Sequence, residues 1–459
     1  MKPALYPTIF LFIFVITSCK KAVDVDLPIN KITSPAVFAD DKTATAAVLG
    51  LYSKMAATAG TFSNGTTSIY MGLSSDELKY MGTASEILAF NTNIISADNG
   101  LLYSNFWADP YKIIYQANAC IEGLNSSSAV TNEVKKQLLG EACFVRAFCY
   151  WYLLNVFGDV PLLLSSDYET NARSARNTST QVTSQIIQDL EAARSMLSKS
   201  YPTSGKLRPN YYVATALLSR VNLKVENWKG VDETAGEIIG SGVYSLETDL
   251  SKCFLIGSKE ALWQLAIPDA QIINTIEGNR FIPVSSVTVV PNYVLTPSLL
   301  SAFESGDLRR TNWVGTKTVS GVSYQYPYKY KVRSNAVKSE HCIVFRLPEL
   351  YLNRAEARCH LNNLPGALSD LNEIKKRANP SGQPFSSTTQ SVVEAAISKE
   401  KRIEFFAEWG MRWFDLGRTG QTDNVLSLAK TAWTGKAKLF PIPATEIQLN
   451  PNLTQNPGF

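Results

Sequence analysis

The segment from residue 131 to residue 157 constrains the fold more than any other part of the chain. Its middle, ACFVRAFCYWYLLNVF, is apolar nearly all round at helical spacing. Because a helix without a polar face must be enclosed by neighbouring elements, this helix cannot lie at a surface. Gly158 and the run Asp159-Val160-Pro161 end it. The sequence therefore predicts a mostly α-helical protein in which several helices surround one long central helix.

Other segments predict the helices that surround it. Helical patterns occur at residues 43–57, 107–124, 181–197 and 209–226. From residue 347, ELYLNRAEARCHLNNLPGALSDLNEIKKRAN predicts a helix hairpin with the apolar spacing of one tetratricopeptide-like unit. The other helix pairs fit that repeat poorly, so periodicity alone predicts only an array of α-hairpins. After the loop 380–390 we expect a helix to Trp409 and then an extended, proline-rich end.

The region between residues 245 and 330 differs from the rest of the chain in composition and periodicity. Glycine, proline, serine and tyrosine become frequent, and helical periodicity fades. Short β-like pieces such as ALWQLAI and TVSGVSYQYPYKY occur within it. We predict long loops with a few short strands, and loops of this length in a compact protein are usually functional or disordered.

The amino terminus has the pattern of an export signal with a lipid attachment site. Lys2 precedes the apolar run 9–16, which is too short to span a bilayer but suits a signal peptide. The following Ile16-Thr17-Ser18-Cys19 resembles the bacterial lipobox, in which the cysteine is lipidated with acyl chains such as palmitate. Two or three chains would anchor the protein stably. The alternative is a cleaved signal of a soluble secreted protein, in which Cys19 is incidental.

Charge and residue counts exclude several classes of function. The 44 basic and 40 acidic residues are too balanced for a nucleic-acid-binding protein. Only two histidines occur, which argues against imidazole metal sites and a His-based catalytic triad. No glycine-rich phosphate loop or calcium loop is present, and we predict no cofactor and no metal. Apart from Cys19, six cysteines remain; disulfides are one possibility, but their apolar helical surroundings favour free, buried thiols.

Several motifs together resemble the SusD/RagB family of outer-membrane nutrient-binding lipoproteins. The stretches that carry the resemblance are EACFVRAFCYWYLLNVFGDVPLL, NWKGVDETAGEIIGSGVYSL, RLPELYLNRAEARCHLNN, ISKEKRIEFFAEWGMRWFDLGRTG and LFPIPATEIQLNPNLTQNPGF. They stand in the family's order over nearly the whole chain, behind the lipobox. The resemblance implies a mostly α-helical, tetratricopeptide-like array of hairpins with a loop-rich ligand-binding face and a few short strands. It also implies an outer-membrane location, facing the exterior, and a SusC-like TonB-dependent transporter as partner.

These patterns divide the chain into a leader, a tether and one body. We expect a lipoprotein signal peptide at 1–18, a lipidated Cys19 with a flexible tether to residue 39, and a single SusD-like body at 40–459. Within the body we distinguish an amino-terminal helical half (40–245), a loop-rich insertion (246–346) and a carboxy-terminal RagB/SusD region (347–459).

The carboxylates between residues 400 and 415 could suggest a glycosidase. Glu400, Glu404, Glu408 and Asp415 would supply paired carboxylates. Basic residues alternate with them at helical spacing, which is typical of a salt-bridged helix face. Such pairing lowers carboxylate pKa values, whereas a general acid needs a raised one. We therefore expect no enzyme activity.

Aromatic residues in the loops are better candidates for a ligand site. Sugar rings present apolar faces that lie flat on aromatic rings, while Asp and Asn side chains bind their hydroxyl groups. The predicted ligand-binding residues are Trp313, Tyr324, Tyr326, Tyr80, Tyr70, Asp76, Asn91, Asn93 and Tyr293. The ordinary alternative for each loop aromatic is packing against its own loop.

The sequence thus predicts a non-catalytic receptor for oligosaccharides in nutrient uptake and polysaccharide utilisation. It would capture the glycan at the cell surface and deliver it to the transporter. Three alternatives stay open: capture of oligopeptides by the same architecture, a glycosidase, and a helical scaffold that holds another protein.

Overall fold

The structure is a computed structural model that describes residues 34–57 and 61–459. The predicted signal peptide and Cys19 lie outside the described residues. The last residues of the predicted tether form the short helix α1 (Ser34–Val37), and Phe38 behind it is buried against Gly123. Residues 34–38, which the predicted tether includes, therefore pack against the helical body.

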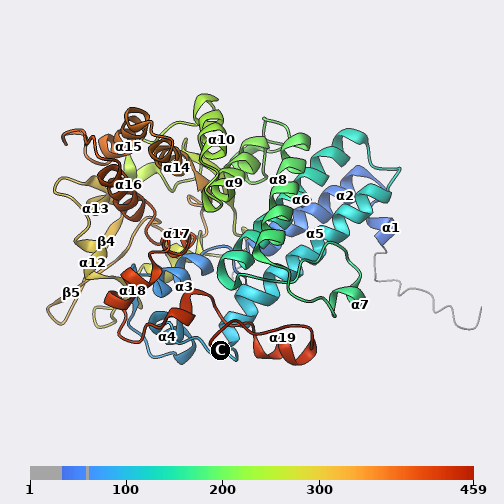
Figure 1. Ribbon diagram of the computed structural model, residues 1–459, viewed down its shortest axis with the longest axis horizontal. Coiled ribbons are helices and arrows are strands. Elements are labelled where there is room, and N and C mark those ends of the chain that lie inside the picture. The colour runs from blue at the N-terminus through green and yellow to red at the C-terminus, as the bar shows by residue number, and fades with distance from the viewer. Residues whose placement is uncertain (1–33, 58–60) are drawn as a thin grey trace, which may run out of the picture.

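An array of packed helices forms one side of the molecule and continues across its top (Figure 1). It runs from α2, α5 and α6 through α8, α9 and α10 to α14, α15 and α16, and each helix contacts the next. The helices of the first half are α2 (Asp41–Met55), α3 (Thr66–Ser74), α4 (Ser85–Thr92), the π-helix η2 (Leu102–Ala108), α5 (Asp109–Ser126), α6 (Asn132–Phe157), α7 (Tyr168–Asn171), α8 (Ser179–Met196), the 3-10 turn η3 (Ser204–Lys206), α9 (Tyr211–Lys224) and α10 (Trp228–Gly240). The prediction of a mostly α-helical hairpin array is confirmed.

Helix α6 is the enclosed central helix that the sequence predicts. Every residue from Gly140 to Leu154 is buried, and α2, α5, α8 and α9 pack around it. Phe148 contacts the ring of Trp263 at a centroid distance of 5.2 Å. The helix ends at Gly158, whose φ of 73° is a conformation that glycine adopts without strain.

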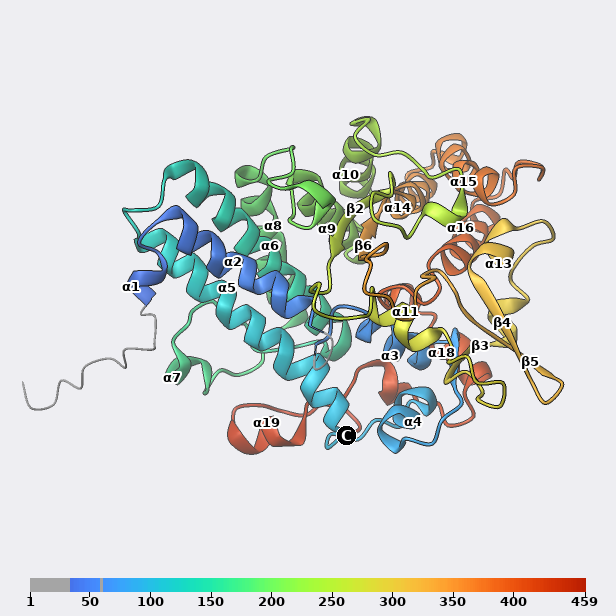
Figure 2. The same ribbon diagram turned by 180° about the vertical axis from the view of Figure 1, so that it is seen from behind.

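The loop-rich insertion carries most of the strands, in three antiparallel pairs. They are β1 (Leu78–Tyr80) with β3 (Tyr293–Leu295), β2 (Ala261–Leu265) with β6 (Cys342–Arg346), and β4 (Val314–Val319) with β5 (Val322–Pro327). Short helices lie between them: η4 (Leu250–Lys252), α11 (Ile276–Phe281), α12 (Pro297–Leu300) and α13 (Leu308–Asn312). The prediction of long loops with short strands is confirmed, and Figure 2 shows β3, β4 and β5 together at one end of the molecule.

The carboxy-terminal region begins with the predicted hairpin and then departs from the prediction. The hairpin is formed by α14 (Leu347–His360) and α15 (Leu364–Ala378). The next helix, α16 (Gln390–Glu404), ends five residues before Trp409, so the predicted end is wrong. Ala407, Trp409 and Gly410 have φ values of 53°, 47° and 71°, which a right-handed helix cannot contain.

The tail is also less extended than predicted. It carries α17 (Met411–Arg418), α18 (Thr422–Ala429), the 3-10 turn η5 (Gly435–Lys438) and α19 (Ala444–Leu449). Pro443 precedes the last of these helices, α19. Each helix of the tail has fewer than nine residues, which is too short to give a clear helical periodicity in the sequence. No described helix is long and apolar enough to cross a membrane.

Candidate functional site

The pairing of β1 with β3 brings together the two parts of the chain that hold the predicted ligand-binding residues, 70–93 and 293–326. Tyr80 lies directly opposite Tyr293, and their ring centroids are 5.5 Å apart at an interplanar angle of 36°. Strand β5 lies beside β3 (Figure 2). The predicted tyrosines of these three strands, Tyr80, Tyr293, Tyr324 and Tyr326, are called the tyrosine region below.

The β4–β5 hairpin holds two of these tyrosines in fixed positions. Tyr324 and Tyr326 alternate onto one face of β5, opposite Lys317 and Gly315 of β4. The ring of Tyr326 lies on Gly315, where an added Cβ would come within 2.3 Å of the ring. Lys317 Nζ donates to the carbonyls of Val284 and Ser286, each at 2.8 Å. These contacts hold the 284–289 loop beside the hairpin.

The exposure of the tyrosine region suits a binding surface. Tyr80, Tyr324 and Tyr326 are half-buried, so each ring is supported by protein and still accessible. Tyr293 is 6% exposed and supports Tyr80 from below, with Phe281 on its other side. Met81, Val287 and Val289 expose apolar side chains on the neighbouring segments. A half-buried aromatic surface with an apolar margin is typical of a site for a ligand with apolar faces.

Of the two other predicted aromatic residues, Trp313 lies apart from the tyrosine region, whereas Tyr70 of α3 lies near Tyr80 and Tyr293. Trp313 is fully buried, and its indole Nε1 donates to the Leu250 carbonyl at 3.0 Å. The ring therefore has no free face and takes no part in the tyrosine region. Tyr70 packs on Phe90 with a centroid distance of 4.7 Å, and burial raises its pKa to about 12.

The predicted polar residues stabilise turns and helix junctions. Asp76 is 3% exposed and forms ion pairs with Arg402 at 2.6 Å and Arg412 at 2.8 Å. Burial opposes ionisation of Asp76, but the hydrogen bond and charge of Arg412, with the charge of Arg402, outweigh it and lower the pKa. Asn91 Oδ1 accepts from the Tyr80 backbone N–H at 3.0 Å, and Asn93 Nδ2 donates to the Ser74 carbonyl at 3.0 Å. Asp76 and Asn93 are therefore buried structural groups, whereas Asn91 is partly exposed and holds the backbone of Tyr80.

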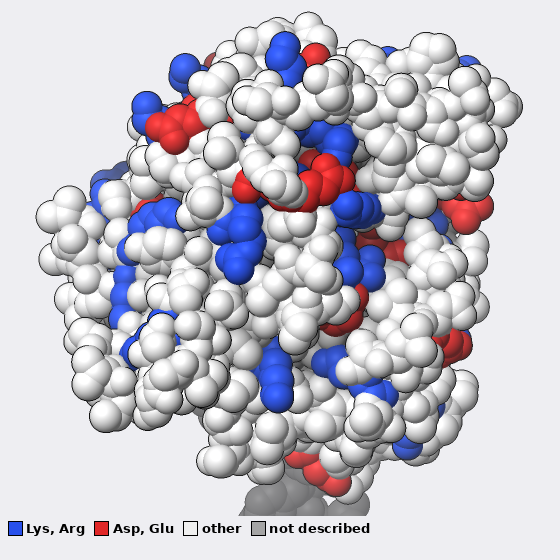
Figure 3. Space-filling model, turned by 90° about the vertical axis from the view of Figure 1, so that its left-hand side faces the viewer, with Lys and Arg blue, Asp and Glu red and all other residues white. Residues whose placement is uncertain are grey.

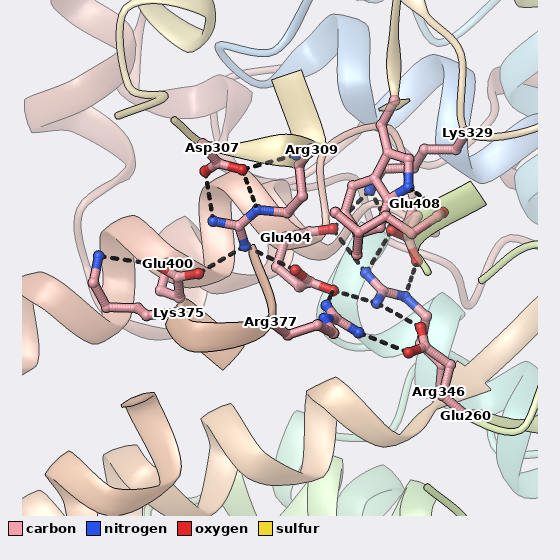
Figure 4. A network of polar contacts seen from close by, with 12 residues as sticks. Glu260, Asp307, Arg309, Lys329, Arg346, Lys375, Arg377, Glu400, Glu404 and Glu408 are labelled. Atoms are coloured by element: carbon pink, nitrogen blue, oxygen red, sulfur yellow. Dashed lines mark hydrogen bonds and ion pairs between the residues drawn. The ribbon is translucent and has the colours of Figure 1, made fainter. Parts of the chain in front are cut away.

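Three of the four carboxylates that suggested a glycosidase, Glu400, Glu404 and Glu408, belong to a buried ion network (Figure 4). Glu404 is fully buried and accepts hydrogen bonds from Arg309, at 2.8 Å, and from Arg346 and Arg377. Burial would raise the pKa of Glu404, but the charges of the three guanidinium groups outweigh it and lower the pKa well below its ordinary value. A general acid needs the opposite shift.

Glu400, Glu408 and Asp415 also form ion pairs. Glu400 lies 2.7 Å from Arg309, Glu408 binds Arg346 and Lys329, and Asp415 lies 2.6 Å from Arg418. The structure therefore supports the interpretation of these carboxylates as salt-bridged structural groups. Among residues 34–57 and 61–459, no group of three or more His, Cys, Asp or Glu side chains is placed to hold a metal ion.

The sequence analysis missed a second aromatic surface along α5. Tyr103, Trp107, Tyr111 and Tyr115 follow one another every fourth residue, which places them on one side of η2 and α5. With Tyr168 of α7 and Leu449 of α19 they line a groove of about 540 Å³, called the α5 groove below. Tyr103, Tyr115 and Tyr168 are 38%, 49% and 72% exposed. The four-residue spacing of aromatics was the signal that could have found it.

Basic side chains are prominent on the end of the molecule that carries α13, α15, α16, β4 and β5. Figure 3 views this end, and Lys and Arg side chains gather in its hollowed middle, with Asp and Glu side chains between some of them. Several of these charges belong to ion pairs, such as Lys375 and Lys399 with Glu304. This end of the molecule therefore carries charged side chains of both signs.

Comparison with known proteins gives two family matches. Residues 37–223 match a family described as "Starch-binding associating with outer membrane", and residues 301–459 match one described as "SusD family". Among curated proteins, SusD-like protein P25 of Formosa agariphila is 24% identical over 77% of this chain and 78% of its own length. The starch-binding protein SusD of Bacteroides thetaiotaomicron is 24% identical over 73% of this chain and 75% of its own.

Solved structures have the same fold. A SusD superfamily protein from Bacteroides vulgatus superposes with a TM-score of 0.81 at 20% identity, covering 92% of this chain and 99% of that one. A laminarin-binding SusD-like protein superposes with a TM-score of 0.77 at 22% identity, covering 92% of this chain and all of the other, 100%. These likenesses extend over nearly the whole described body and confirm the tetratricopeptide-like helical architecture.

Proposed function

Because this chain belongs to the SusD family, we propose that it captures oligosaccharides at the cell surface without cleaving them and delivers them to a TonB-dependent transporter in the outer membrane. The observation that carries the proposal is the tyrosine region, where β1 and β5 both lie against β3 and carry half-buried tyrosine rings near exposed apolar side chains. Relatives named for binding starch and laminarin support a carbohydrate as ligand.

The rings of Tyr80, Tyr324 and Tyr326 can supply enough affinity for this role. Each offers an apolar face with a hydroxyl at its edge, which matches a sugar ring with polar substituents around an apolar face. Half-burying one such pair would contribute about 2–3 kcal/mol at ~25 cal/mol per Å². A ligand with millimolar to micromolar affinity needs about 4–8 kcal/mol, so one or two stacked rings would dominate binding.

The location follows from the amino terminus. A lipid on Cys19 would hold the protein at the outer membrane, facing the exterior, and the polar segment after it would serve as the tether. A SusC-like transporter barrel, which the lipoprotein covers as a lid, would be the partner. Co-purification of the two proteins from solubilised outer membranes is the expected result, and recovery with a soluble protein partner alone would favour the scaffold alternative.

Affinity electrophoresis in gels that contain different glycans tests the ligand and its site. The double variant Tyr80→Ala with Tyr324→Ala should lose retention by the glycan that retards the unaltered protein. The matched control, Tyr103→Ala with Tyr115→Ala, removes two exposed tyrosines from the α5 groove and should leave retention unchanged. Loss of retention in the control instead would place the glycan in the α5 groove and refute the proposed site.

The same preparations distinguish the remaining alternatives. Oligopeptides that bind to the unaltered protein, while no glycan does, would favour peptide capture. Release of reducing ends from a bound glycan, abolished by Glu404→Gln, would overturn the proposal that the protein only binds.

A further inference from the structure

The motif at residues 397–420 forms part of a small pocket that the proposed glycan site does not use. Residues of α6, α9, α14, α16 and α17 line the pocket. Its volume is about 40 Å³. Since a water molecule needs at least ~10–15 Å³ measured in this way, the pocket has room for roughly three water-sized atoms.

Hydrogen-bond donors without acceptors line this pocket. Trp151 Nε1, Asn353 Nδ2 and Arg402 Nε are buried and have no hydrogen-bond partner among the described residues. Trp151 and Asn353 are 3% and 2% exposed. An indole or a guanidinium N–H can only donate, and a buried donor without an acceptor destabilises the fold. Three such donors on one small pocket indicate that a molecule rich in acceptor atoms occupies it.

The charges around the pocket point to an anion. Six basic side chains line it: Arg220, Lys224, Lys401, Arg402, Arg412 and Arg418. Five of them form ion pairs with four carboxylates, those of Glu349, Glu356, Asp76 and Asp415. Within the described part of the chain, Lys224 has neither an ion-pair partner nor a hydrogen-bond acceptor. The positive charge at the pocket therefore exceeds the negative charge that faces it.

Lys224 is held in an environment that disfavours its own charge. It is the last residue of α9, and burial lowers its pKa, to which the nearby charge of Arg418 adds. A negative ligand in the pocket would remove this penalty, because an opposite charge at contact distance favours the ionised ammonium. Water could satisfy the N–H groups, but it would not balance the charge.

We propose that this pocket binds a small carboxylate, which accepts hydrogen bonds from Trp151 Nε1 and Arg402 Nε and pairs with Lys224. The volume suits one carboxylate group and is too small for a sugar ring. Two sources have this chemistry: a free carboxylate such as acetate, or the carboxylate of an acidic sugar whose ring stays at the mouth. The pocket is built from residues outside the tyrosine region, so the proposal does not depend on the proposed glycan site.

The indole N–H of Trp151 provides a direct probe. The chain has 8 tryptophans, and the indole signal of Trp151 in a ¹⁵N–¹H spectrum of the labelled full chain is identified by its loss in Trp151→Phe. Sodium acetate should shift this signal in a saturable manner, whereas sodium chloride at the same ionic strength should not. Lys224→Met should weaken the acetate response about tenfold or more, since a charge-assisted hydrogen bond is lost.

The control is Lys229→Met, which removes a lysine whose side chain is 82% exposed and should leave the response unchanged. Sodium glucuronate separates the two sources: a shift with acetate alone identifies a free carboxylate, and saturation at lower glucuronate than acetate concentration identifies an acidic sugar. No saturable shift with either compound would mean that the pocket holds only water and would overturn the proposal. A shift with chloride alone, or one that survives Lys224→Met, would overturn the carboxylate assignment.

Discussion

The rings of Tyr80 and Tyr293 contact each other at a tilt across the β1–β3 pair, and Tyr80 is the more exposed of the two. Tyr293 is 6% exposed and lies between Tyr80 and Phe281. One ring is thus available to a ligand, and the other fixes its position. In this pair, Tyr80 would bind the ligand and Tyr293 would support the ring of Tyr80.

Substitution of each tyrosine by alanine should separate binding from stability. Tyr293→Ala leaves a cavity in a packed aromatic group and should lower the free energy of unfolding by about 3–5 kcal/mol. Tyr80→Ala should cost about 1 kcal/mol, because its ring is already half in water, yet it should abolish retention by the glycan. Urea unfolding and affinity electrophoresis measure the two effects. Equal losses of stability in the two variants would contradict the assignment of Tyr80 as the binding residue and Tyr293 as the supporting residue.

The sequence was sufficient to predict the helices and loops whose residue pattern lies within one continuous segment. The all-apolar stretch predicted that α6 is enclosed, and the glycine, proline and tyrosine content of residues 245–330 predicted loops with short strands. It could not predict which strands pair. The contact between Tyr80 and Tyr293 joins segments far apart in the chain, and nothing within either segment specifies the partner.

Burial of individual aromatic residues was equally hard to predict. Trp313 stands in a loop-like, polar sequence, yet it is fully enclosed and lies under the ammonium group of Lys329 at 4.9 Å. The end of α16 at Glu404 depends on positive φ angles at Ala407 and Trp409, although neither is a residue type that usually ends a helix. In both cases tertiary contacts override the local preference.

Removal of the central carboxylate of the ion network should be strongly destabilising. Glu404→Gln removes the one carboxylate that pairs with all three of Arg309, Arg346 and Arg377 in a fully buried site. Breaking one partner of a buried ion pair typically costs about 3–5 kcal/mol. The comparison variant is Glu304→Gln, which removes a carboxylate at 47% exposure and should cost no more than about 1 kcal/mol. Urea unfolding at pH 7 checks both values, and a loss of less than 1 kcal/mol for Glu404→Gln would show that the network is not required for stability.

The thiols should be unreactive in the folded protein. Cys120, Cys143, Cys149, Cys253, Cys342 and Cys359 are free and buried. Burial raises the pKa of Cys120 to about 11, so little thiolate forms at pH 8. A thiol reagent should react slowly with the native protein and with six thiols after denaturation. A seventh reactive thiol in protein isolated from its own membranes would show that Cys19 carries no lipid, and fewer than six would indicate a disulfide.

Two buried glutamates should make stability fall as the pH rises from about 5 to 8. Burial raises the pKa of Glu77 from its ordinary 4.5 to about 8 and that of Glu277 to about 7. Between pH 4.5 and these values the folded protein keeps protons that the unfolded chain releases. The free energy of unfolding should therefore decrease from pH 5 to pH 8, by up to roughly 7 kcal/mol at ~1.4 kcal/mol per pKa unit for the two groups together.

The variants Glu77→Gln and Glu277→Gln should flatten this decrease, because an amide has the shape of the protonated carboxyl group and does not titrate. Glu304→Gln is again the control. Its hydrogen bond from Lys399 lowers the pKa of Glu304 to about 2, so its contribution is present above pH 4.5 and is lost only as the pH falls toward 2. Glu304→Gln should change the free energy of unfolding below pH 4.5. It should leave the slope between pH 5 and pH 8 unchanged. Urea unfolding at intervals across this range measures the slope, and an unchanged slope in the Glu77→Gln, Glu277→Gln double variant would mean that both carboxylates are ionised in the folded protein.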